Sequence, residues 1–113
     1  EGSETFDQLR ARVSHSILSI AACHPGKTVA IFSHGMAIRN VLAHFQGISI
    51  DKTNEAVPHG DNTAVALLEI DSGGVEIKYM NDNSHLSDDT STLARQSWWK
   101  SKDGTFSKSY RIW

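Results

Sequence analysis

Ser33-His34-Gly35 is the part of this sequence whose residue types are best suited to chemistry. The triplet ends a short apolar run at 28–33, and a helical pattern of apolar residues begins directly after it at Met36. Ligands of open α/β sheets bind beyond the carboxyl ends of the strands, which is where this order places His34. The free N–H groups of Gly35 and Met36 and the dipole of the following helix favour an anion, phosphate above all. A protonated His34 would add a charge-assisted hydrogen bond to a phosphoryl oxygen.

The structural alternative is that His34 only satisfies a turn, and the local pattern leaves both interpretations open. Other chemistries have less support. Phe32 stands where a G-x-S-x-G nucleophile elbow requires glycine. The sequence has no H-x-x-x-H or C-x-x-C pair, no P-loop and no G-x-G-x-x-G, so it predicts no dedicated metal site. We expect the remaining helical histidines to be surface residues; they are His15, His24 and His44.

The elements that would position the triplet follow from the spacing of apolar residues. An amphipathic helix is predicted over about 4–24. Thr5 followed by Gln8 fits a capping box at its start, and Ser3 is a competing N-cap. The apolar face of this helix comprises Phe6, Leu9, Val13, Ile17 and Ile20. The run at 28–33 is apolar at nearly every position, which predicts a central strand covered on both faces. A second helix is predicted over about 36–46.

Strand patterns dominate the second half of the chain. A polar connection at 48–61 contains the turn residues Pro58-His59-Gly60-Asp61 and leads to predicted strands at 62–70 and 75–80. Turn residues at 71–74 separate the two strands, which predicts a β-hairpin. The order helix, strand, helix, strand, strand predicts an α/β domain with a mixed sheet.

Composition narrows the classes of protein to which the chain can belong. Its 113 residues are 39% hydrophobic and 21% charged with a formal net charge of -2, which is typical of a folded soluble domain and excludes a general nucleic-acid binder. No apolar stretch approaches the roughly 20 residues that span a bilayer, and no signal peptide opens the chain. The single cysteine, Cys23, cannot form an internal disulfide. We therefore expect a cytoplasmic protein in a reducing compartment.

Several segments resemble the histidine phosphatase superfamily, the phosphoglycerate-mutase-like proteins. "SHGMAIRNVL" after an apolar run is similar to the second histidine motif of that family, and "GSETFDQLRARV" is similar to its Gly-x-Glu-Ser segment. Asn62 at the start of a strand and the later "NDNSHL" also fit, in the order of the family. The resemblance implies that residues 1–86 are the C-terminal portion of a histidine phosphatase domain. Residues 87–113 would be a tail, with a short helix at 93–99.

The resemblance implies a fold and a mechanism. The fold would be the three-layer α/β arrangement of the family, a mixed, mainly parallel sheet flanked by helices. In that family a nucleophilic histidine in an Arg-His-Gly motif accepts the phosphoryl group, and a second histidine and two arginines surround it. A carboxylate from the first half acts as acid and base. The covalent phosphohistidine divides one difficult step into two, and the cationic donors stabilise the transferring charge.

The family roles map onto individual residues of this chain. His34 matches the second catalytic histidine. Substrate or phosphate binding is implied for Glu4, Ser33, Gly35, Met36 and Asn62. The residue after Glu4 is Thr5 where the family has serine, a mild departure. Arg12 and Arg39 match recurrent arginines, for which we expect structural ion pairs or capping; for His85, bracing and packing both remain open.

The main departure is that no Arg-His-Gly occurs in this chain. We therefore predict a phosphomonoester hydrolase represented by its second half and inactive alone. A phosphoglycerate-type mutase and a non-catalytic phosphate-binding or interaction module are the alternatives; Ser33 before the histidine favours the phosphatase. The expected ligand is a phosphorylated small molecule, without cofactor, nucleic acid or membrane. We also expect a homo-oligomer or association with the missing N-terminal half, because an incomplete sheet exposes edges and apolar faces.

Overall fold

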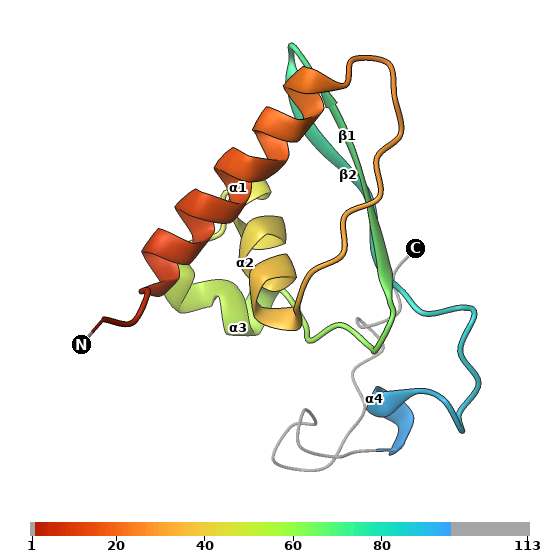
Figure 1. The fold of residues 1–113 in the computed structure, drawn as a ribbon. Helices are drawn as coiled ribbons and strands as arrows, with labels where there is room; N and C mark the ends of the chain where they lie inside the picture. Colours follow the sequence, from red (N-terminus) through yellow and green to blue (C-terminus); the bar gives the residue numbers. More distant parts are fainter. Residues whose placement is uncertain (1, 96–113) are drawn as a thin grey trace. The chain divides into compact units, whose positions relative to one another are not determined.

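The computed structural model describes residues 2–95, which form two units (Figure 1). The first unit comprises the chain up to residue 57 together with the hairpin turn at 70–75. The second unit comprises residues 58–69 and the chain from residue 76 onward. None of the helices in this described part is long and apolar enough to cross a membrane.

Helix α1 (Phe6–Cys23) confirms the first predicted helix and its capping box. The Gln8 N–H donates to Thr5 Oγ1 at 3.2 Å, and the Thr5 N–H donates to Gln8 Oε1 at 2.9 Å. These two bonds satisfy donors that the first turn of a helix would leave free. Phe6 is exposed, and the rest of the predicted apolar face is half-buried. The two buried residues of α1 are Arg10 and Ser14.

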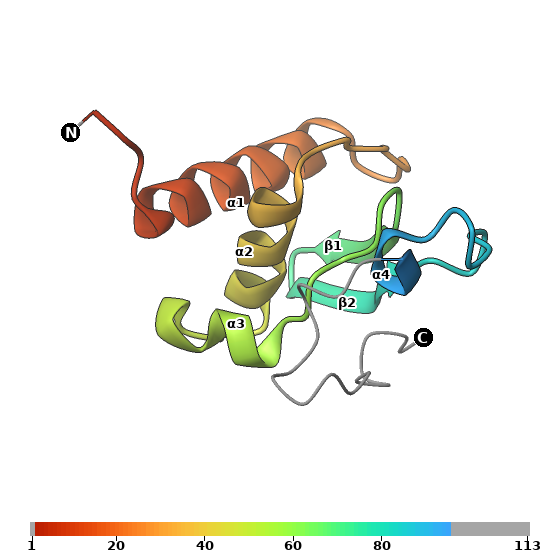
Figure 2. The ribbon, with the colours of Figure 1, turned by 90° about the horizontal axis from the view of Figure 1, so that it is seen from below.

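Helix α2 (Gly35–Phe45) packs against α1 and carries most of the apolar core of the first unit. Figure 2 shows α2 crossing close to α1. The buried apolar side chains of this unit are Val41, Leu42, Ala43 and Val57. The second predicted helix, 36–46, is therefore confirmed within one residue at each end. The buried residues of α2 run consecutively from Arg39 to Ala43, and α2 contacts both α1 and the short helix at 53–56. Such tertiary packing is the usual source of helix stability in a small domain.

The predicted polar connection at 48–61 is wrong over its first half, which is helical. A 3₁₀ turn, η1 (Ile50–Lys52), leads into the single-turn helix α3 (Thr53–Ala56). The Thr53 hydroxyl donates to the Ser49 carbonyl at 2.9 Å, a local bond that stabilises the turn. Short turns of this kind depend on contacts with neighbouring elements more than on apolar periodicity, so the sequence pattern did not reveal them.

The predicted central strand at 28–33 is also wrong, because the structure pairs this segment with no other strand. Residues 27–34 form the coil between α1 and α2, drawn without an arrow in Figure 1. Its side chains are exposed, and Phe32 keeps 94% of its surface accessible. A strand is defined by hydrogen bonds to a neighbouring chain segment, and none of the described residues provides one here. The apolar composition favours burial, but the pairing that would bury it is not within residues 2–95.

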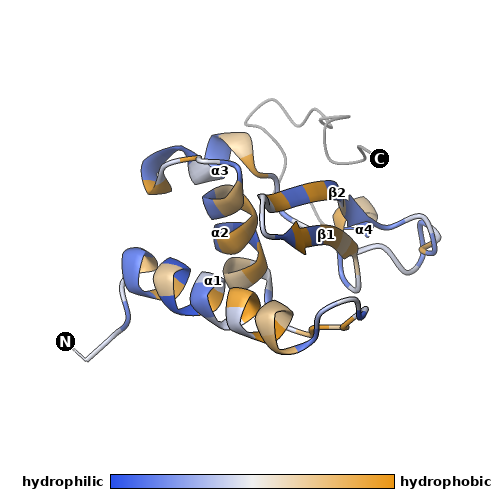
Figure 3. Cartoon of the chain, turned by 90° about the horizontal axis from the view of Figure 1, so that it is seen from above, coloured by the Kyte–Doolittle hydropathy of each residue, from blue (hydrophilic) through white to orange (hydrophobic). Residues whose placement is uncertain are grey.

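Strands β1 (Val65–Asp71) and β2 (Gly74–Asp82) form a two-stranded antiparallel hairpin, as the turn residues between them predicted. Exposed and half-buried side chains alternate along β1 and along β2 as far as Tyr79, and in β2 Figure 3 shows a matching alternation of hydropathy. The mainly parallel character of the predicted sheet does not appear in the sheet that residues 2–95 form. The helix predicted at 93–99 begins as α4 (Thr92–Arg95). The remainder of that prediction, and the tail at 101–113, lie outside the described residues.

Candidate functional site

His34 is the N-cap residue of α2, the position from which a helix presents its free N–H groups. Its backbone is extended, with φ −118° and ψ 157°, and its carbonyl accepts the first helical bond from Ile38 N–H at 3.0 Å. No side chain caps this end of the helix. The N–H groups of Gly35 and Met36 therefore have no hydrogen-bond partner among residues 2–95, and the helix dipole places partial positive charge there.

The surroundings of His34 leave room for a ligand. Ser33, His34 and Gly35 are exposed, and Met36 keeps 43% of its surface accessible. A β-carbon added to Gly35 would meet nothing within 4 Å, so an anion can approach the two N–H groups closely. The imidazole of His34 makes no hydrogen bond within the described part of the chain. This end of α2 therefore combines free backbone donors and a titratable ring, which together suit a phosphate oxygen.

Arg39 anchors α2 just over one turn beyond His34. Its side chain is buried at 5% exposure, and its Nε donates to the Val57 carbonyl at 2.5 Å. Its Nη2 donates to the Asn54 carbonyl at 3.0 Å. Arg39 thus holds the end of α3 against α2, which is the capping role that we predicted for it.

Arg10 is a second buried arginine, which the sequence analysis missed. Its Nη2 donates to Thr53 Oγ1 at 2.7 Å and to Asn40 Oδ1 at 3.5 Å, and its Nη1 donates to the Ile48 carbonyl. Asn40 in turn donates to the Met36 carbonyl at 2.9 Å. This chain of bonds connects α1 to the first turn of α2. The sequence does contain a sign of this role, because residue 10 falls on the apolar face of α1. A charged side chain at such a position requires buried hydrogen-bond partners.

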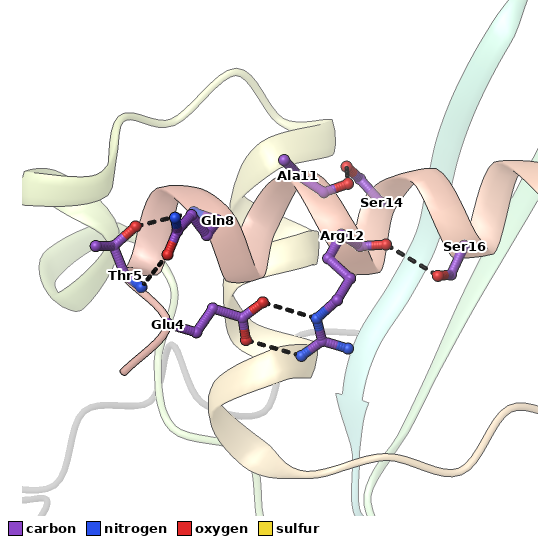
Figure 4. Close-up of polar contacts among 7 residues, drawn as sticks. All are labelled: Glu4, Thr5, Gln8, Ala11, Arg12, Ser14 and Ser16. Carbon is purple, nitrogen blue, oxygen red and sulfur yellow. Dashed lines mark hydrogen bonds and ion pairs between the residues drawn. The ribbon is translucent and has the colours of Figure 1, made fainter. Parts of the chain in front are cut away.

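Glu4 and Arg12 form a two-pronged ion pair along α1 (Figure 4). Arg12 Nε donates to Glu4 Oε2 at 2.7 Å, and Arg12 Nη2 donates to Glu4 Oε1 at 2.9 Å. The hydrogen bonds from Arg12, and then its positive charge, lower the pKa of Glu4 below its ordinary value. The same contacts raise the pKa of Arg12. Glu4 is therefore held as a carboxylate, and Arg12 takes the ion-pair role predicted for it.

Asn62 lies in the second unit, and its side chain holds two segments of that unit together. Its Oδ1 accepts a hydrogen bond from the Thr92 N–H at 2.8 Å, at the start of α4. Its backbone N–H donates to Asp61 Oδ1 at 2.9 Å. The other predicted site residues, namely Glu4, Ser33, His34, Gly35 and Met36, belong to the first unit.

Asp61 lies at the centre of a hydrogen-bond network in the second unit. The sequence pattern predicts only a turn at this residue. The carboxylate accepts bonds from the Ser91 hydroxyl, from Asn83 Nδ2 at 3.0 Å and from the Leu93 N–H at 3.2 Å. The Asp61 N–H donates to Asn81 Oδ1 at 2.8 Å. Burial would raise the pKa of Asp61, but these bonds together hold it below its ordinary value. The spacing of residues in the sequence does not reveal this hydrogen-bond network, because the partners of Asp61 lie 20 to 32 residues away.

Next to Asp61, Thr63 adopts an uncommon backbone conformation. Its φ is +56°, a left-handed value that β-branched residues rarely adopt. Its Oγ1 lies 2.9 Å from Nε2 of His85, so His85 braces this turn. A separate hollow of the same unit is lined by Thr90, Ser91, Thr92 and Arg95, and none of the predicted site residues lines it. Residues 2–95 contain no cluster of three or more His, Cys, Asp or Glu that could hold a metal ion.

The family model of the histidine phosphatase superfamily (branch 1) matches residues 1–83. Among solved structures, Bacillus stearothermophilus YhfR is similar, with 28% sequence identity and a TM-score of 0.70 over 75% of this chain and 42% of that chain. The present chain thus spans less than half the length of YhfR. A search of curated proteins finds no match.

Proposed function

This chain belongs to the histidine phosphatase superfamily (branch 1), and on that premise we propose that it takes part in phosphomonoester hydrolysis through a phosphohistidine intermediate. A nucleophilic histidine nitrogen would attack phosphorus while the ester P–O bond breaks and the alcohol leaves with a proton from an acid. Water would then attack phosphorus and give its proton to the same acid group, now deprotonated, while the P–N bond breaks and inorganic phosphate leaves. No Arg-His-Gly occurs in these 113 residues, so the nucleophile would come from residues outside this sequence.

The observation that carries this proposal is the start of α2. The exposed imidazole of His34 adjoins two backbone N–H groups, at Gly35 and Met36, that have no partner among residues 2–95. In both steps the negative charge of the transferring phosphoryl group must be stabilised. These N–H groups already point to where that charge develops, so they can stabilise it without a change in conformation. His34 would act as the supporting histidine, donating to a phosphoryl oxygen rather than attacking phosphorus. Ser33, directly before it, would line the same side of the phosphate site.

Glu4 would bind the organic part of the substrate. Glu4 carries negative charge and would repel phosphate, but Arg12 neutralises it through both oxygens. Each oxygen of Glu4 keeps a lone pair that can accept a hydrogen bond from a substrate hydroxyl. Substrate binding by Asn62 is a separate proposal that concerns the second unit alone: its oxygen already accepts from the Thr92 N–H, so its amide hydrogens would be the groups that donate.

Phosphate binding at α2 can be tested by NMR on the whole chain. Titration with inorganic phosphate should shift the amide resonances of Gly35 and Met36 and the ring resonances of His34. In His34→Ala the amide shifts should weaken, whereas in His44→Ala they should persist. His44 is a matched control, because it is an exposed histidine in the last turn of the same helix. Equal loss in both variants, or no shift at all, would contradict the proposed site.

The expected inactivity of the chain alone can be tested separately by turnover. With p-nitrophenyl phosphate, the chain alone should release no nitrophenol above background. Removing one member of a cooperating catalytic set commonly costs several orders of magnitude, and this sequence contains no Arg-His-Gly. Robust turnover that disappears in His34→Ala would contradict this prediction and would show that the 113 residues contain a nucleophile.

A second candidate is a phosphate-binding module without catalysis. It is favoured by the same absence of Arg-His-Gly from the 113 residues. Both candidates predict phosphate binding at α2. The two candidates predict different results when a polypeptide that contains an Arg-His-Gly motif is added. Turnover that depends on His34 would support the hydrolase. Phosphate binding without turnover would support the module.

A further inference from the structure

Arg10 is a buried cation that forms no ion pair within residues 2–95. It is 9% exposed, and its Nε is buried without a hydrogen-bond partner in the described part of the chain. Its three acceptors are all neutral, namely the Ile48 carbonyl, Thr53 Oγ1 and Asn40 Oδ1. Burial of a charge is costly unless the charge is paired. Hydrogen bonds alone therefore do not explain why a full positive charge lies at this position.

Asn40 connects this charge to the start of α2. Arginine can only donate hydrogen bonds, so Oδ1 of Asn40 faces Arg10 and Nδ2 donates to the Met36 carbonyl at 2.9 Å. That carbonyl belongs to the same peptide group as the N–H of Ala37. The peptide group is trans, so this N–H points away from the carbonyl, toward the open end of the helix.

The N–H of Ala37 is a further free donor of the first turn. The first helical bond of α2 is donated by Ile38, and none of residues 2–95 accepts a bond from Ala37 N–H. A bond received by the carbonyl of a peptide group strengthens the N–H of that group as a donor, because hydrogen bonds in a chain polarise one another. The dipoles of the Asn40 amide and the 36–37 peptide group thus follow one another, with their negative ends toward Arg10.

We infer that Arg10 is a positioning residue of the anion site at the start of α2, which it strengthens through Asn40 without touching the anion. Phosphate bound there supplies the negative charge that the guanidinium lacks within residues 2–95. The bond between Arg10 and Asn40 is long, at 3.5 Å. The charge of Arg10 therefore carries the effect more than this single bond does, since a Coulomb energy falls only with the inverse of the distance. The inference rests on the phosphate site of the proposed function.

A purely structural role for Arg10 would use its hydrogen bonds and not its charge, and Asn40→Asp separates the two roles. Aspartate has the shape of asparagine and still accepts from Arg10, so the free energy of unfolding in urea should not fall. The new carboxylate neutralises the guanidinium and cannot donate to the Met36 carbonyl. At pH 7 the Kd of the whole chain for inorganic phosphate, measured by NMR from the amides of Gly35 and Met36, should rise about tenfold.

Thr53→Val is the matched control. It removes another acceptor of Arg10, at 2.7 Å, but leaves the link from Asn40 to Met36 in place. It should lower the free energy of unfolding, because Arg10 loses a buried partner, and should keep the phosphate Kd within about twofold. The stable variant thus loses phosphate affinity and the destabilised variant keeps it. A purely structural role predicts the reverse order.

Arg10→Met removes the cation without adding a negative charge, so it excludes simple repulsion of phosphate by a new carboxylate. Its phosphate Kd should rise about fivefold or more, with circular dichroism confirming that the helices remain. A second measurement needs no ligand. Hydroxide is an anion, so hydroxide-catalysed hydrogen exchange of Ala37 N–H reports the local potential. This exchange should slow about threefold or more in Arg10→Met and Asn40→Asp, but not in Thr53→Val.

Unchanged phosphate affinity in Asn40→Asp or in Arg10→Met would overturn the inference and leave the phosphate site in place. Equal losses of affinity in Asn40→Asp and Thr53→Val would also overturn it. If the unchanged chain binds no phosphate at α2, the proposed function is contradicted, and the exchange of Ala37 N–H still decides on Arg10. Slower exchange in Arg10→Met and Asn40→Asp would then support the influence of its charge on this donor, and an equal rate in all variants would reject it.

Discussion

Both carboxylate oxygens of Glu4 are bound by one side chain, the guanidinium of Arg12, eight residues further along the chain. The planar fork of arginine matches a carboxylate with two parallel bonds, which a lysine ammonium cannot do. Arg12 therefore fixes the direction of Glu4 as well as its charge. The pair is exposed to solvent, so its consequence lies in the ionisation and orientation of Glu4 rather than in the stability of the fold.

Replacing Arg12 by Gln should raise the pKa of Glu4 toward its ordinary value. The hydrogen bonds from Arg12 are the largest cause of the lowered pKa, and glutamine would remove the charge with them. A pH titration of the Glu4 carboxyl carbon by ¹³C NMR measures the change. Arg95→Gln is the control, since Arg95 donates to the Asp89 carbonyl and has no bond to Glu4. An unchanged Glu4 pKa in Arg12→Gln would show that the ion pair does not form in solution.

Arg10→Lys should destabilise the first unit by about 2 kcal/mol, because a lysine cannot serve all of the acceptors that Arg10 binds. The Ile48 carbonyl and Thr53 Oγ1 lie at different ends of the guanidinium. The free energy of unfolding in urea, followed by circular dichroism, measures the loss. Arg12→Lys on the same helix should change it little, because Arg12 is exposed. Equal effects of the two substitutions would contradict the buried network.

Asp61→Asn should destabilise the second unit by about 2 kcal/mol, because an amide offers one acceptor oxygen where the carboxylate offers two. One of the Ser91, Asn83 and Leu93 donors would lose its partner in a buried site. Hydrogen exchange of β2 amides reports the stability of this unit. Asp88→Asn, an exposed aspartate in the loop before α4, is the control and should leave exchange unchanged.

Acid should weaken the second unit through Asp61. The pKa of its carboxyl is lowered in the folded protein, so the unfolded chain binds the proton more readily. The stabilisation is complete above the ordinary value of 3.8 and is lost as the pH falls from there through the lowered folded-state pKa. Exchange of β2 amides measured between neutral and acidic pH should show this loss. In Asp61→Asn the dependence in that window should flatten, and an unchanged slope would contradict the role of Asp61.

Gly35→Ala should leave the fold intact, whereas Gly26→Ala should cost about 1 kcal/mol. Gly26 has a φ of +71°, which alanine adopts only with strain, but Gly35 is not in that region and has open space where a β-carbon would lie. Urea unfolding of the two variants provides the comparison. The stability of Gly35→Ala allows its phosphate binding to be measured on a folded protein. Equal destabilisation would show that the backbone at Gly35 differs from the structure.

The helices and the hairpin could be predicted because their signals are local. The capping box of Thr5 and Gln8, the three- and four-residue spacing along α1 and the turn residues at 71–74 each involve neighbours in the sequence. His34 was placed at a helix start for the same reason, and the structure puts it at the N-cap of α2.

The remaining features depend on distant partners, which spacing does not reveal. Residues 28–33 have strand composition but no strand, because pairing requires a neighbour outside residues 2–95. Arg10 was passed over because its acceptors lie 30 to 43 residues away. Asp61 was assigned to a turn by the residues around it, whereas its contacts with Asn81, Asn83 and Ser91 make it the centre of a network.

The bonds from Arg39 to the carbonyls of Asn54 and Val57 connect the position of α2 to that of residues 54–57. Five residues separate Arg39 from His34, which is about 7.5 Å of helix axis. A rigid rod of that length transmits a displacement at one end almost unchanged to the other. A substitution that moves residues 54–57 would therefore misalign the imidazole of His34 without touching it. Loss of function from changes in this remote turn would then result from misorientation of His34, and not from the loss of any group at the site.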